Sequence, residues 1–127
     1  MLGKPIPTKM REAMDAQEYY HRCARFEALH DHECEADPVR GRLIEWEHAF
    51  TESGAKLNEI WAIVPICWLV HRGGMLNKEI NQWLALNRAT PADFDKYPKS
   101  KAAWLQKLAY LNSKYGIPNL STQKAPF

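Results

Sequence analysis

Four residues near the middle of the chain carry side chains that could bind a metal ion or move a proton: Glu47, His48, Cys67 and His71. Glu47 and His48 are neighbours, and a carboxylate beside an imidazole can hold a divalent ion while an uncoordinated imidazole takes a proton from water. The Cys-x3-His step from Cys67 to His71 lets a thiolate and an imidazole converge on one ion, a mixture that zinc accepts. A histidine in an apolar strand is more often a hydrogen-bonded core residue, so this group alone does not establish catalysis.

A second group of histidines and cysteines lies upstream. The 14 residues from His21 to Cys34 hold three of the five histidines and two of the three cysteines. Because His30, His32 and Cys34 alternate, they would share one face of a strand. Such crowding favours a metal-binding loop or short hairpin over core packing. The sequence therefore predicts a structural zinc site, and its predicted ligands are Cys23, Cys34, Cys67 and His71.

Two apolar runs and a helix must position these groups. The runs Leu43–Phe50 and Trp61–Trp68 are rich in branched and aromatic residues, and the turn signal Thr-Glu-Ser-Gly follows the first of them. They predict a hairpin with a long loop between its strands. Residues Leu76–Ala89 follow the 3.6-residue period of an amphipathic helix, with Leu76, Ile80 and Leu84 among the apolar positions.

Further helices are predicted on both sides of this core. Thr8 is expected to cap a helix over Lys9–Tyr20, and Thr90-Pro91 to start a short helix through Lys96. Tyr97-Pro98 is expected to end that helix. A last helix should open at Ser100 and end before Gly116. Its predicted inward-facing residues are Trp104, Leu105, Leu108 and Leu111.

The predicted fold class is therefore α+β, with a small β-hairpin and flanking N- and C-terminal helices. At 127 residues the chain is expected to be one domain. We expect residues 1–20 to form an arm and helix, 21–90 the zinc-supported core and 91–127 a helical extension. No apolar run reaches the roughly 18 residues of a membrane span and the N-terminus has no apolar core, so a cytoplasmic protein without a membrane partner is expected. Three cysteines cannot pair completely, which favours thiols or metal ligands over disulfides.

Charge is distributed unevenly. Residues 1–71 carry eight Lys/Arg against twelve Asp/Glu, a net charge of −4, and residues 72–127 carry nine against three, a net charge of +6. This asymmetry is compatible with an enzyme that acts on a polyanion, and equally with a solvated helical face rich in lysine. Several basic residues flank the group of Glu47, His48, Cys67 and His71, and they could neutralise phosphates without reading bases. These residues are Arg40, Arg42, Arg72, Lys78 and Arg88.

The order of these motifs resembles the HNH nucleases, also called ββα-metal or His-Me finger nucleases. The shared order is Glu47-His48, an apolar strand ending Pro65-Ile66-Cys67, then His71 and a helix. The phrases GRLIEWEHAF, WAIVPICWLVH and LNKEINQWLALNRAT look like a group of small phage and prophage proteins of HNH type. The likeness covers roughly residues 21–90, and it implies a ββα-metal, treble-clef-like core.

The resemblance also implies roles for individual residues. His48 matches the general-base histidine of the family, and Glu47 matches the metal-binding acidic residue before it, which is usually Asp. His71 matches the final histidine, a metal ligand. Cys67 matches the first cysteine of the zinc knuckle that many members contain. The implied function is a metal-dependent DNA endonuclease, with magnesium or another divalent ion in the catalytic site and zinc in the structural site.

Several positions depart from the family pattern. Ala62 occupies the place of the usual middle asparagine, and Asn58 lies four residues earlier. Val70 stands where the second knuckle cysteine would fall, and valine cannot bind zinc. Cys23 and Cys34 are much farther apart than a normal Cys-x2-Cys knuckle.

These departures leave open which metal ion His71 binds. If zinc takes Cys23, Cys34, Cys67 and His71, the site is closed and structural, because four protein ligands leave no position for substrate. If His71 serves a catalytic ion with Glu47, zinc must use the remaining histidines His21, His30 or His32. The alternative function is therefore a degenerate HNH-like module that binds DNA or a host protein without cutting, as a phage accessory or anti-defence factor. A phage-encoded protein would act in the cytoplasm of the bacterial host.

Overall fold

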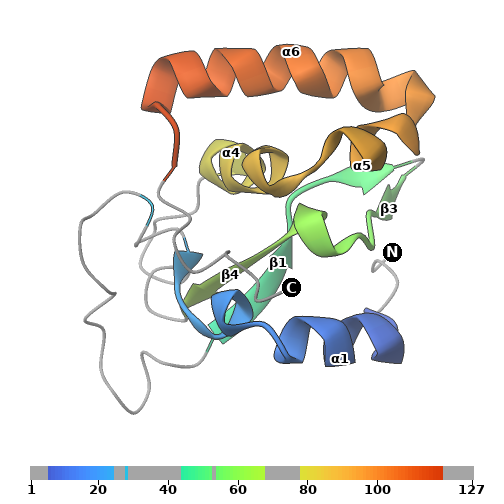
Figure 1. Ribbon diagram of the computed structural model, residues 1–127, viewed down its shortest axis with the longest axis vertical. Helices are drawn as coiled ribbons and strands as arrows, with labels where there is room; N and C mark the ends of the chain where they lie inside the picture. Colours follow the sequence, from blue (N-terminus) through green and yellow to red (C-terminus); the bar gives the residue numbers. More distant parts are fainter. Residues whose placement is uncertain (1–5, 25–27, 29–43, 53, 68–77, 119–127) are drawn as a thin grey trace.

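An antiparallel hairpin in the middle of the chain lies between two groups of helices. The computed structural model describes residues 6–24, 28, 44–52, 54–67 and 78–118. These residues form a small α+β domain, which confirms the predicted class, and α4 lies between the hairpin and α6 (Figure 1). No helix in these ranges is long and apolar enough to cross a membrane. The elements in chain order are α1 (Thr8–Asp15), η1 (Glu18–His21), β1 (Ile44–His48), β2 (Thr51–Glu52), β3 (Ala55–Lys56), η2 (Ile60–Ala62), β4 (Ile63–Cys67), α4 (Lys78–Arg88), α5 (Pro91–Asp95) and α6 (Pro98–Tyr115).

The predicted hairpin is formed by β1 and β4. Their register runs from Ile44 opposite Cys67 to His48 opposite Ile63. The long loop expected between these strands contains a second, short hairpin, in which β2 pairs with β3. Gly54 makes its turn possible because it has a φ of 82°, a left-handed conformation that costs glycine little. The segment between β1 and β4 is therefore held by its own backbone pairing.

Strand β4 is covered on both sides. Its residues Ile63, Val64 and Ile66 are completely buried, as suits branched side chains on a pleated surface. Helix α4 contacts β4, and so does η1. In the β1–β4 ladder Pro65 stands opposite Trp46.

Helix α4 is anchored to the end of α6 by a buried tryptophan. Trp83 is 1% exposed, and its Nε1 donates to Asn112 Oδ1 at 3.1 Å and to the Gly116 carbonyl at 2.8 Å. A buried indole N–H needs a hydrogen-bond acceptor, and this one is shared between two. The structure confirms the predicted helix over Lys78–Arg88, whereas Leu76 lies outside the described residues.

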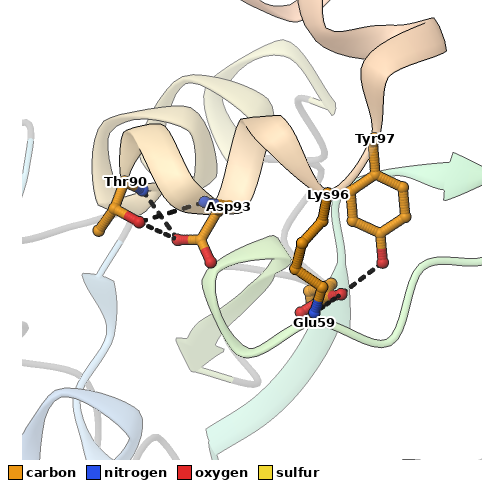
Figure 2. Close-up of polar contacts among 5 residues, drawn as sticks. All are labelled: Glu59, Thr90, Asp93, Lys96 and Tyr97. Carbon is orange, nitrogen blue, oxygen red and sulfur yellow. Dashed lines mark hydrogen bonds and ion pairs between the residues drawn. The ribbon is translucent and has the colours of Figure 1, made fainter.

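The capping prediction at α5 is confirmed. The Thr90 hydroxyl accepts from the Asp93 amide, and the Asp93 carboxylate accepts from the Thr90 amide (Figure 2). This reciprocal pair satisfies two of the backbone donors that a helix start leaves without partners.

Two predictions for the last helix are wrong. Helix α6 begins at Pro98, two residues before Ser100, because proline fits the first helical position, where no amide donor is needed. Leu105 faces solvent and is 40% exposed, since the buried stripe of α6 passes through Trp104, Leu108 and Leu111 at spacings of three and four residues. The predicted end before Gly116 is confirmed, and Gly116 has a φ of 87°.

The N-terminal helix is shorter than predicted. Thr8 is the first residue of α1 and Pro7 takes the cap position, without a side-chain cap hydrogen bond. The helix ends at Asp15, and Tyr19 and Tyr20 lie in the separate turn η1, where both are buried. The Trp46 indole donates to the Tyr20 carbonyl at 2.8 Å, so η1 packs on β1.

Glu79 in α4 forms an acid-sensitive contact with the end of α6. Its carboxylate accepts from Lys114 Nζ at 2.7 Å and from the Tyr115 hydroxyl at 2.6 Å. The Lys114 and then the Tyr115 hydrogen bond lower the pKa of Glu79 below its usual 4.5. Because this pKa is lower in the folded than in the unfolded state, the contact stabilises the fold at neutral pH and is lost as pH falls through the folded-state value.

We therefore expect Glu79→Gln to lower the melting temperature at pH 7, with a difference from the unmodified protein that shrinks on acidification toward pH 3. Thermal unfolding followed by circular dichroism across this range measures the difference. Glu12→Gln changes an exposed glutamate of α1 and serves as the control. A difference between Glu79→Gln and the unmodified protein that stays constant with pH would contradict the assigned role of the carboxylate.

Candidate functional site

His48 is the last residue of β1, at the point where the main hairpin gives way to the short one. Its Nε2 lies 2.6 Å from Asn58 Oδ1. Since an amide oxygen accepts only, Nε2 is the donor and carries the proton. In the neutral ring Nδ1 is then the unprotonated nitrogen and keeps its lone pair.

The contact with Asn58 follows from the register of the short hairpin. Thr51 pairs with Lys56, and the Leu57 amide donates to the Phe50 carbonyl at 3.0 Å. One step further along this register brings Asn58 beside the end of β1. Ala62, at the position where the family pattern has its asparagine, is completely buried in η2. The asparagine that contacts His48 is thus Asn58.

A pocket of about 290 Å³ opens beside His48. Lys56 lines it from β3 and Lys78 from the start of α4, so two elements far apart in sequence contribute basic residues to the pocket that His48 lines. Gln82 is fixed at its wall, because its Nε2 donates to the Ala49 carbonyl at 3.2 Å and its Oε1 accepts from Lys107 Nζ at 2.9 Å. The described lining residues are His48, Ala49, Phe50, Thr51, Lys56, Lys78 and Gln82.

The pocket is suited to an anion. Two lysines in the lining of one pocket favour a negatively charged group there, and the attraction is stronger in a recess than on an open surface. The lining also offers hydrogen-bonding groups from Thr51 and Gln82. A phosphate group of a nucleic acid has the charge and the acceptor oxygens that such a set binds.

Glu47 is half-buried next to His48 in β1, where it stands opposite Val64. Consecutive strand residues point to opposite faces, and Glu47 is not among the described residues that line the pocket. His71, the other predicted ligand of a catalytic ion, lies outside the described residues. The described part of the pocket offers neutral oxygen ligands from Thr51 and Gln82, and it does not include the carboxylates that usually hold magnesium.

The predicted zinc ligands are described only in part. Cys23 follows η1 and is 2% exposed, and Cys67 is the last residue of β4. Cys34, His30, His32 and His71 lie outside the described residues. Within the described ranges no three His, Cys, Asp or Glu side chains form a group that could hold a metal ion. Zinc binding stays a prediction.

The predicted phosphate contacts have different surroundings. Lys78 lines the pocket, whereas Arg88 ends α4, about 15 Å away along the helix axis. The Arg88 guanidinium carbon lies 3.9 Å from the centre of the Tyr19 ring, and Nη2 donates to Gln17 Oε1 at 3.2 Å. Stacking on an aromatic face stabilises a guanidinium, so Arg88 joins α4 to the N-terminal segment. Arg40, Arg42 and Arg72 lie outside the described residues.

Sequence reasoning did not assign Lys56 or Gln82 to the site. A lysine in a predicted loop and a glutamine on a helix carry no signal of their own. The tight turn at Gly54 does carry one, because it fixes which residues of the short hairpin lie next to His48. The position of this turn could therefore have indicated that Asn58 lies beside His48.

Comparison with known proteins gives no further assignment. No protein-family model matches the chain, and neither a curated protein nor a solved structure matches it.

Proposed function

We propose that this protein is a metal-dependent DNA endonuclease of HNH type, in which β1, β4 and α4 make up the ββα-metal core and His48 is the general base. The observation that carries the proposal is the hydrogen bond from His48 Nε2 to Asn58 Oδ1, in a pocket that Lys56 and Lys78 line. The antiparallel pairing of β1 with β4 also supports it, as does the packing on β4 of α4, the next described element of the chain.

The hydrogen bond with Asn58 assigns the two ring nitrogens to different tasks. Nε2 donates to Asn58 and holds the ring in place, so Nδ1 is the nitrogen that accepts a proton. It takes this proton from a water molecule as the water oxygen forms a bond to phosphorus. The bond from phosphorus to the leaving oxygen breaks in the same displacement, and the leaving oxygen takes a proton from solvent.

The lysines of the pocket hold the substrate. Lys56 and Lys78 neutralise backbone phosphate and read no base, so binding should be insensitive to sequence and should weaken as salt rises. A divalent ion, when bound, supplies stabilisation of the charge on the phosphate and the leaving oxygen. By the family resemblance Glu47 and His71 would hold this ion, and zinc would then draw on His21, His30 or His32. If zinc instead takes Cys23, Cys34, Cys67 and His71, the catalytic ion loses His71 as a ligand.

Nicking of supercoiled plasmid DNA tests the proposal. Purified protein should convert the plasmid to its open circular form in magnesium or manganese, and excess EDTA should stop the conversion. If no divalent ion supports nicking, the enzyme proposal fails.

The same preparation then decides the alternative, a module that binds DNA or a host protein without cutting. Slower migration of a plasmid fragment in a gel-shift assay, with an affinity that falls steeply as salt rises, would favour a DNA-binding module. One tightly held zinc per chain with no response to added magnesium would indicate the closed structural site.

A further inference from the structure

The loop that carries Asn58 is tied to the junction between α5 and α6 by the next residue along the chain. Glu59 accepts a hydrogen bond from the Tyr97 hydroxyl and forms an ion pair with Lys96 Nζ at 2.9 Å (Figure 2). The Glu59 side chain is 17% exposed, so these two contacts are partly shielded from water. A carboxylate that meets both an ammonium and a hydroxyl at a half-buried position is held more firmly than one in a surface ion pair.

The junction that supplies these two groups is itself well fixed. The Tyr97 amide donates to the Phe94 carbonyl at 3.0 Å, and the Tyr97 carbonyl accepts from the amides of Ser100 and Lys101, both at 2.9 Å. The Tyr97 ring packs edge-on against Trp104, with ring centres 5.5 Å apart. Burial first, and then the hydrogen bond to Glu59, raises the pKa of Tyr97, so its hydroxyl keeps the proton that it donates.

A second tie lies close to the first. Ser100 Oγ donates to Glu52 Oε1 at 3.1 Å, which attaches strand β2 to the first turn of α6. The segment from β2 to η2 thus contacts the α5–α6 junction at both of its ends. The short hairpin and the residues after it are held against the C-terminal helices.

Asn58 and Glu59 face in different directions. Glu59 has an extended backbone, with φ −128° and ψ 139°, and consecutive side chains of an extended segment point to opposite sides. Glu59 points to Tyr97, whereas Asn58 points to His48. A hydrogen bond at one residue of this pair therefore fixes the direction of the other.

We infer that Tyr97 is a positioning residue of the catalytic site, which acts through Glu59 and Asn58 to hold the His48 ring. The inference rests on the proposed function for its kinetic consequence, and its structural consequence can be measured without any nuclease activity. The C-terminal extension thereby becomes part of the site although it contributes no group that touches substrate.

Tyr97→Phe removes the hydroxyl and keeps the ring that packs on Trp104. We expect the His48 Nε2 proton, observed by NMR, to exchange with water roughly tenfold faster in this variant, because the hydrogen bond to Asn58 opens more often. In plasmid nicking, kcat should fall roughly tenfold while KM stays within about twofold, since misplacement of a catalytic group affects the chemical step. Tyr110→Phe makes the same chemical change at an exposed position of α6 and should alter neither quantity.

A double variant separates positioning from a general loss of stability. Asn58→Ala removes the acceptor itself, so adding Tyr97→Phe to it should produce no further change in exchange or kcat. Glu59→Ala, which removes the acceptor of the Tyr97 hydroxyl, should reproduce the effect of Tyr97→Phe and replaces it as the test if that variant folds poorly.

Unchanged exchange of the His48 proton in Tyr97→Phe and Glu59→Ala would overturn the inference, as would effects of Tyr97→Phe and Asn58→Ala that simply add. Nicking by the unmodified protein is measured separately. If the protein does not nick but the proton exchange responds as expected, the proposed function fails and the positioning role stands.

Discussion

Replacing His48 with alanine should abolish divalent-dependent nicking of plasmid DNA. The imidazole is the group that takes the proton from water, and loss of a general base typically costs about 10²- to 10⁴-fold in rate. The pocket keeps Lys56 and Lys78, so the affinity for DNA should stay close to that of the unmodified protein. Initial rates of nicking, and a gel shift with the same plasmid fragment, measure the two quantities.

Gln106→Ala provides a control for this change. Gln106 is exposed on α6 and is not among the described residues that line the pocket. This control should nick at the rate of the unmodified protein. Zinc content and the circular dichroism spectrum of His48→Ala should match those of the unmodified protein. Retention of full nicking by His48→Ala would remove His48 from the chemistry.

Replacing Trp104 with alanine should lower the free energy of unfolding by about 3–5 kcal/mol, as expected when a large buried aromatic side chain is removed from a core. Trp104 is 7% exposed, and its ring packs against those of Phe50, Trp61, Phe94 and Tyr97. It joins α6 to both α5 and the segment after β1. Its loss leaves a cavity that this many aromatic rings cannot fill by small movements.

Leu105→Ala is the natural comparison, because Leu105 is the next residue and was expected from the sequence to face inward. Its exposure of 40% predicts a change within about 0.5 kcal/mol. Urea unfolding of both variants measures the change. Circular dichroism is the better probe, because Trp104→Ala removes part of the tryptophan fluorescence. Equal destabilisation by the two substitutions would contradict the orientation of α6.

The sequence predicts the elements well where local chemistry determines them. The turn signal before Gly54 and the apolar runs on either side indicate a hairpin, and Thr90-Pro91 indicates the start of a helix. Pro98 shows the limit of such reasoning. The same proline ends α5, because the residue before it leaves the helical conformation, and begins α6, because it needs no amide partner there. Read as a stop signal alone, it places the start of α6 two residues late.

The site is predictable in part for a similar reason. His48 stands out by its type and its neighbour, and Lys78 by its charge, so both appear from the sequence. The partner of His48 depends on the pairing of β2 with β3, which fixes the place of Asn58. The surroundings of Arg88 depend on Tyr19, nearly seventy residues earlier in the chain, and no local pattern reports such a contact.

The proline in β4 bears on how molecules of this protein meet one another. Among the described residues β4 pairs only with β1, so no described strand lies along its other edge. Open edges can recruit strands from other molecules and start aggregation. Pro65 has no amide hydrogen, and proline is accepted in a sheet where the missing donor faces away from the neighbouring strand. An incoming strand would therefore find a gap in the row of donors at the middle of β4, which protects the hairpin from association through its edge.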